Sequence, residues 1–105
     1  MKETLRPQLL LVAVVFLASA VGFAQSSGQA TYKAKCQMCH GATGTPSPGM
    51  AKMMGIKPVS DPAIKALTAD QMFTAVKNGK GKMKPVTGLT DAEIKDAVIF
   101  YRGLN

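Results

Sequence analysis

The sequence predicts a small all-α domain whose own apolar core is too small to stabilise it. Two segments begin with a Thr-x-x-Glu or Thr-x-x-Gln pair and continue with apolar residues at helical spacing. No segment shows the alternation of apolar and polar residues that is typical of a strand. The 105 residues allow one domain, only 6% of them are aromatic, and Trp is absent. Residues 25–105, which remain once the predicted export signal is removed, lie near the ~70–80 residues below which a domain usually needs a staple. The composition therefore predicts that a bound group completes the core.

Composition also excludes several classes of function. With 47% hydrophobic and 18% charged residues the chain is not a disordered polyelectrolyte. Two cysteines are too few for a disulfide scaffold, and one histidine excludes mechanisms that need two imidazoles. We therefore expect no enzyme with a deep protein-walled cleft, and any chemistry must come from a bound cofactor.

The first residues have the pattern of an export signal. Lys2 and Arg6 precede an uncharged apolar run from Leu9 to Ala24. Small residues permit cleavage after Ala20 or after Ala24, and the polar residues that follow favour the second site. Residues 1–24 are therefore predicted to be a signal peptide and residues 25–105 the domain.

This organisation predicts an exported protein, periplasmic in a Gram-negative cell, with a charge of +7 for the whole chain. The alternative is an uncleaved membrane anchor over residues 9–24, although this run is shorter than the ~20 residues of a spanning helix. No basic stretch with interleaved aromatic residues indicates nucleic-acid binding. We expect a monomer.

Three main helices are predicted in the domain. Gln29 to Gln37 contains no helix breaker. The segment Thr68 to Asn78 opens with a capping box and stops at a glycine, and a second box at Thr90 and Glu93 opens a helix that continues to Leu104.

The remaining segments are predicted to be mostly loops. A short helical turn is expected over Ala63 to Leu67, after a proline. The segments Gly41 to Gly49 and Gly79 to Pro85 are rich in Gly and Pro and are predicted to be loops.

The motif Cys36-Gln37-Met38-Cys39-His40 indicates covalent attachment of a c-type haem. Two thiols spaced by two residues at a helix end can each add to one haem vinyl group, and the histidine that follows can then bind iron. A thioredoxin-like pair would use the same cysteines but expects strands. Zinc would lack a fourth ligand, and a disulfide-stapled domain remains an alternative.

Residues 28 to 105 resemble a class I cytochrome c, a single-haem, all-α electron carrier. The residues that carry the resemblance are Gly28, Tyr32, Cys36 to Gly41, Asn78 to Pro85, Leu89 to Ile94 and Val98 to Leu104. The resemblance implies three main helices wrapped around one covalently bound haem c, with Gly28 and Phe100 at the crossing of the terminal helices.

The family's axial methionine matches Met83. This residue lies in a glycine-rich loop, far enough from His40 in the chain to reach the opposite face of the ring. Met50, Met53 and Met54 remain competing candidates. Pro48 resembles the family's proline whose carbonyl accepts the hydrogen bond of the axial histidine, and its alternative role is an ordinary turn proline.

These residues predict a one-electron carrier with iron ligated by His40 and Met83, since a thioether ligand favours ferrous iron. Alternatives are a gas-binding or weakly peroxidatic protein with a labile sixth ligand, and a tethered haem subunit of a respiratory complex. Lysines around the site would steer the protein toward redox partners with acidic docking surfaces, or they form an ordinary solvated surface. These lysines are Lys33, Lys35, Lys77, Lys80, Lys82 and Lys84.

Overall fold

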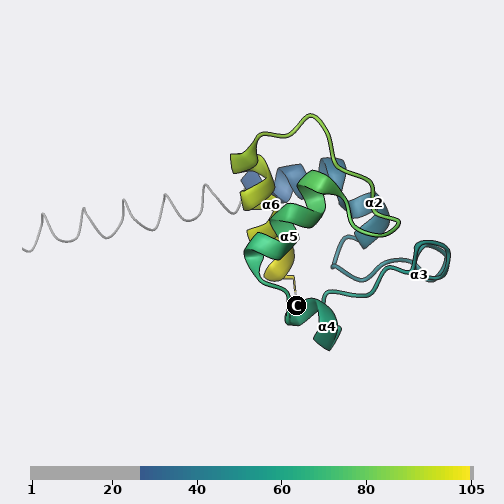
Figure 1. The fold of residues 1–105 in the computed structure, drawn as a ribbon. Coiled ribbons are helices and arrows are strands. Elements are labelled where there is room, and N and C mark those ends of the chain that lie inside the picture. The colour runs from purple at the N-terminus through teal and green to yellow at the C-terminus, as the bar shows by residue number, and fades with distance from the viewer. Residues whose placement is uncertain (1–26, 105) are drawn as a thin grey trace, which may run out of the picture.

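The computed structural model describes residues 27–104, and the regular structure in this range is helical (Figure 1). A first helix covers residues 27–35, which confirms most of the predicted Gln29–Gln37 segment. It is followed by α2 (Gln37–His40), α3 (Pro48–Met54), α4 (Pro62–Lys65), α5 (Ala69–Asn78) and α6 (Asp91–Arg102). The predicted all-α fold is confirmed. The signal peptide and its two cleavage sites lie outside the described residues.

Helix α5 has the limits that its sequence predicts. The Thr68 hydroxyl accepts from the Gln71 N–H at 3.1 Å, and Gln71 Oε1 accepts from the Thr68 N–H at 2.8 Å. These two bonds satisfy donors that the first turn of any helix leaves without intrahelical partners. The helix ends at Asn78, and Gly79 follows with a φ of +82°.

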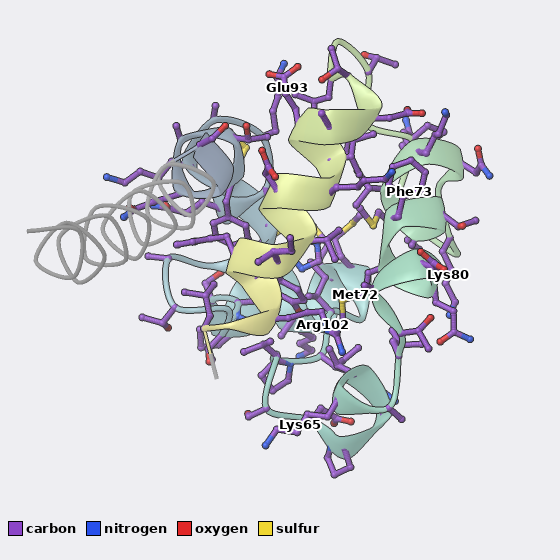
Figure 2. All side chains as sticks on the ribbon, turned by 90° about the vertical axis from the view of Figure 1, so that its left-hand side faces the viewer. Lys65, Met72, Phe73, Lys80, Glu93 and Arg102 are labelled. Carbon is purple, nitrogen blue, oxygen red and sulfur yellow. The ribbon has the colours of Figure 1, made fainter. Side chains whose placement is uncertain are left out.

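Helix α6 begins with the second capping box. The Thr90 hydroxyl accepts from the Glu93 N–H at 3.1 Å, and Glu93 Oε1 accepts from the Thr90 N–H at 2.9 Å. Figure 2 shows Glu93 near the start of this helix and Arg102 at its end. Leu104, predicted to be helical, instead lies in a turn beyond the helix.

The core lies where α5 and α6 pack together. Met72 of α5 is 7% exposed, and it packs with Ile94 and Val98 of α6. The buried hydrophobic core of the described residues comprises six side chains, which agrees with the small core that the composition predicts. They are Tyr32, Val59, Met72, Ile94, Ala97 and Val98.

The first helix crosses α6 at a glycine. A Cβ added to Gly28 would lie 2.2 Å from the Asp96 carbonyl oxygen and 3.2 Å from the Phe100 Cβ. No side chain fits in this space, so the two backbones approach closely. The predicted contact between Gly28 and Phe100 is confirmed.

Two short helices contribute little to this core, and of their residues only Ile64 of α4 packs against the Met72 cluster. Helix α3 begins inside the segment predicted to be a loop: Ser47 caps it by accepting from the Met50 N–H at 3.3 Å, Pro48 is its first residue, and Gly55 follows it with a φ of +67°. Helix α4 begins at Pro62 with Asp61 as its cap, close to the predicted turn. Neither helix has a buried residue, and in Figure 1 α3 lies at the edge of the molecule.

Within residues 27–104 no helix combines the length and the apolar character that crossing a bilayer requires.

Candidate haem-attachment site

The cysteine motif occupies the junction between the first helix and α2. The Cys36 N–H donates to the Tyr32 carbonyl at 2.9 Å, so Cys36 continues the hydrogen-bond pattern of the first helix. The N–H groups of Cys39 and His40 both donate to the Cys36 carbonyl, at 3.2 and 3.0 Å. These bonds hold both thiols and the imidazole on one helical turn.

Both cysteines are half-buried and are not joined in a disulfide. Burial raises the pKa of the Cys36 thiol, and the nearby Cys39 sulfur raises it further. Because a thiolate is the nucleophile in most cysteine chemistry, the raised pKa of Cys36 argues against a redox-active thiol pair with a stabilised thiolate.

His40 presents a neutral imidazole. Burial lowers its pKa, so the ring is uncharged at neutral pH, the form in which histidine binds metals. Its Nδ1 atom is buried without a hydrogen-bond partner among residues 27–104. The Tyr101 ring of α6 packs edge-on against the imidazole, with 5.6 Å between the ring centroids.

The turn after His40 includes Gly44, which packs against Val59. The sequence did not predict a role for Val59. The Gly44 carbonyl accepts from the Val59 N–H at 2.8 Å, and a Cβ on Gly44 would lie 2.6 Å from Val59 Cγ1. Val59 is 5% exposed and therefore closes the core beside the motif. No short motif marks Val59 in the sequence, because it meets Gly44 only through tertiary folding.

Met83 lies in a tight turn. The Lys80 N–H donates to the Met83 carbonyl at 2.9 Å, and the Met83 N–H donates to the Lys80 carbonyl at 3.0 Å. Gly81 has a φ of +58°, which a residue with a side chain rarely adopts. The turn fixes the backbone of Met83, and its side chain is half-buried.

The competing methionines lie on α3, close to the same turn. The Lys82 ammonium donates to the Met53 carbonyl at 3.2 Å, which connects the Met83 turn to the end of α3. Met53 is 63% exposed, whereas Met50 and Met54 are half-buried. The structure therefore brings both sets of candidate sulfur ligands to one region of the molecule.

Pro48 is exposed and is the first residue of α3. At this position its carbonyl faces the N–H of residue 52 within the helix. The predicted hydrogen bond from His40 Nδ1 to Pro48 is not formed in this structure. The role of Pro48 stays a prediction.

The residues present fit a c-type haem. Two unpaired thiols lie on one helical turn with a neutral imidazole, and one nitrogen of that imidazole is buried without a partner. Thioether side chains, which are soft iron ligands, lie on α3 and in the 80–83 turn. No group of three or more His, Cys, Asp or Glu residues that could hold a metal ion occurs in the described part of the chain.

The comparisons with known proteins agree with this site. Residues 23–100 match the family model described as cytochrome c oxidase, cbb3-type, subunit III. A solved structure, the KustC0563 c-type cytochrome, is similar with a TM-score of 0.65 and 26% identity over 73% of this chain and 95% of that chain. No curated protein matches the sequence.

The family model spans well over half of the chain and includes the cysteine motif, the Met83 turn and most of α6. The similar solved structure is itself a c-type cytochrome of nearly the same extent as the matched part of this chain. The chain therefore belongs to the family of the cbb3-type cytochrome c oxidase subunit III domain, and it is a monohaem c-type cytochrome domain.

Proposed function

We propose that this protein carries single electrons through one haem c attached to Cys36 and Cys39, with His40 and Met83 as the axial ligands of the iron. The observation that carries the proposal is the arrangement of both thiols and the imidazole on one turn, held by the shared Cys36 carbonyl. The family match adds support, because the family model is described as subunit III of a cbb3-type cytochrome c oxidase.

Each residue of the site has one task. The two thiols attach the cofactor, and the protein thereby gains the large apolar group that its core needs. His40 Nε2 is the nitrogen that we assign to iron, because Nδ1 is buried. Met83 supplies a neutral sulfur ligand from a turn that two backbone bonds hold rigid.

A bound haem supplies an iron that changes between the ferric and ferrous states. If His40 and Met83 both bound the iron, no coordination position would stay open for a substrate. Ligands that stay in place on rigid elements need little rearrangement when an electron arrives or leaves. This arrangement suits an electron carrier rather than an enzyme.

The test begins with the exported full chain made together with a cytochrome-maturation apparatus. We expect a gain of one haem mass, low-spin iron and, in the ferric state, the weak near-red absorption of a methionine–iron bond. Mass spectrometry of the same sample also locates the N-terminus and so distinguishes cleavage of residues 1–24 from a retained anchor. A colourless protein would contradict the proposal.

Met83→Ala should leave the haem attached, remove the near-red band and lower the reduction potential, because a soft sulfur ligand favours ferrous iron. Met53→Ala is the matched control, since Met53 is 63% exposed on α3 and its loss should leave all three properties unchanged. If the band instead disappears with Met50→Ala or Met54→Ala, the ligand comes from α3. Rapid carbon monoxide binding by the reduced wild-type protein would favour a ligand-binding haem protein.

The surface around the site suits partners with acidic docking surfaces. Lys80, Lys82 and Lys84 are exposed on and beside the Met83 turn, and Lys33 and Lys35 are exposed just before the cysteine motif. Exposed lysines near the site would speed encounter with an acidic partner at low ionic strength. A respiratory oxidase is one such partner class, since the family model describes an oxidase subunit.

A further inference from the structure

Four aromatic rings form a continuous contact chain from the attachment site to the helix crossing. The Tyr101 ring lies against His40, and the Tyr32 ring stacks on Tyr101 with 6.0 Å between centroids and 23° between planes. Phe100 ends this series of rings, with 5.3 Å between its ring centroid and that of Tyr32. His40 is thus connected through two tyrosines to the crossing of the first helix and α6.

Tyr32 adds a second connection to the same region. It is 2% exposed, and its hydroxyl donates a 2.6 Å hydrogen bond to the carbonyl of Gly41, the residue that follows His40. Gly41 has a φ of +85°, and a Cβ there would lie 2.0 Å from the Thr45 carbonyl oxygen, so only glycine fits at this position. This bond ties the His40 backbone to the most buried side chain of the first helix.

Among residues 27–104 no hydrogen-bond partner of Nδ1 fixes the plane of the imidazole. A metal-binding histidine usually donates its second nitrogen to a carbonyl or carboxylate, which sets the orientation of the ring. In this structure Nδ1 has no hydrogen-bond partner among the described residues, and the Tyr101 ring contacts the imidazole at an interplanar angle of 64°. An edge-to-face contact of this kind restrains the rotation of both rings.

We propose that Tyr101 and Tyr32 are positioning residues for the axial ligand: Tyr101 fixes the plane of the His40 imidazole, and Tyr32 fixes its backbone through Gly41. This inference rests on the proposed function in that it takes His40 as the iron ligand. Burial raises the pKa of both phenols, so both tyrosines stay neutral and Tyr32 remains a hydrogen-bond donor over the physiological pH range.

The orientation of the imidazole matters for electron transfer because the ring plane decides which iron orbital overlaps with the ligand. A ring held in one orientation gives one set of magnetic axes and one reduction potential. A ring that is free to rotate gives a distribution of magnetic axes and of reduction potentials. The two tyrosines would therefore keep the site electronically uniform without touching the iron.

The experiment compares Tyr101→Leu with Phe100→Leu in the haem-loaded protein. Both variants remove one aromatic ring from the same helix and the same contact chain, but only Tyr101 touches His40. The readouts are the electron paramagnetic resonance spectrum of the ferric protein, its reduction potential and its urea midpoint. We expect both variants to lower the urea midpoint, and only Tyr101→Leu to shift or broaden the resonance lines and to shift the potential.

Conservative variants separate the two tasks. Tyr101→Phe keeps the ring and should restore the wild-type spectrum. Tyr32→Phe keeps the stacking but removes the bond to Gly41, and it should broaden the lines less than Tyr101→Leu does. If Tyr101→Leu does not fold, Tyr32→Phe still tests the backbone half of the proposal, and a spectrum identical to the wild type would overturn that half.

Labelling distinguishes this proposal from the proposed function. His40 is the single histidine of the chain, so ¹⁵N-histidine introduces one labelled ring. Hyperfine coupling of that label to the ferric iron in the wild type tests whether His40 is a ligand. With the coupling present, equal spectra for Tyr101→Leu and Phe100→Leu would overturn the positioning role alone. Absence of the coupling would overturn the ligand assignment and this inference with it.

Discussion

The region formed by α5 and α6 and the region around the cysteine motif are stabilised in different ways. Helices α5 and α6 each begin with a complete capping box, and between them they bury Met72, Ile94, Ala97 and Val98. Helices α2, α3 and α4 are short and bury no residue. The motif region is instead connected by single hydrogen bonds, such as those to the carbonyls of Gly41, Gly44 and Met53.

This difference shows which part of the domain depends on the cofactor. Apolar burial and capping stabilise α5 and α6 without any bound group. Helices of four to seven residues are not stable alone, because the first turn of a helix is costly to form. Two of these short helices, α2 and α3, carry Cys39, His40 and four methionines, and Cys36 is the N-cap of α2. Attachment of haem is therefore expected to stabilise the weaker region where it binds.

The largest effect should come from Cys36→Ala combined with Cys39→Ala. Without both thiols the cofactor is not attached, and we expect the domain to lose its protease resistance and its cooperative unfolding. Met38→Ala is the control, because Met38 lies between the cysteines and is 86% exposed. A double variant that is folded, protease-resistant and free of haem would show that the motif region is stable by itself.

A smaller effect is expected where the first helix crosses α6. Gly28→Ala would place a Cβ at 2.2 Å from the Asp96 carbonyl oxygen, and overpacking of this kind lowers the free energy of unfolding by roughly 1–3 kcal/mol.

Gly49→Ala is the matched control, because a Cβ at this helical position has no atom within 4 Å. The better helix propensity of Ala should raise stability by about 0.5–1 kcal/mol. Urea unfolding of the haem-loaded proteins measures both changes. Equal urea midpoints for the two variants would mean that the first helix and α6 leave room for a side chain at Gly28.

The smallest expected effect is a difference between the two capping boxes in how their contribution to stability depends on pH. Hydrogen bonds with Thr90 hold the pKa of Glu93 below its ordinary value of 4.5. The contribution of this carboxylate to stability is therefore complete above pH 4.5 and is lost as the pH falls through the lower pKa of the folded state.

Glu93→Gln should accordingly weaken the pH dependence of the urea midpoint between pH 6 and pH 3, and Gln71→Glu should strengthen it by giving α5 the same titrating box. The wild-type protein measured in parallel cancels the titration of all other groups. Three identical pH profiles would show that neither box responds to charge.

Local signals in the sequence predicted the stronger region well. Thr68 with Gln71 and Thr90 with Glu93 mark both helix starts, and the structure forms both boxes. The capping predictions succeeded because a cap is decided by residues three positions apart. The contact between Gly28 and Phe100 was implied by the family resemblance rather than by a local signal, and the two residues meet at the helix crossing.

The weaker region was predicted less completely. Ser47, Pro48 and Gly55 are a cap, a first-turn proline and a terminating glycine, and together they could have indicated α3. Val59 carries no such signal, and its place against Gly44 follows only from the path of the folded chain.

The sequence by itself determined the helical fold, the thiol and imidazole motif and the excess of methionine over aromatic residues, because each depends on residue type and short spacing. Only the tertiary structure decided which side chains surround His40. Tyr32 and Tyr101 lie on different helices, 69 positions apart, and their rings stack, with Tyr101 against the imidazole, because the first helix and α6 cross at a glycine. Contacts between distant segments depend on how helices pack, and no local pattern records that geometry.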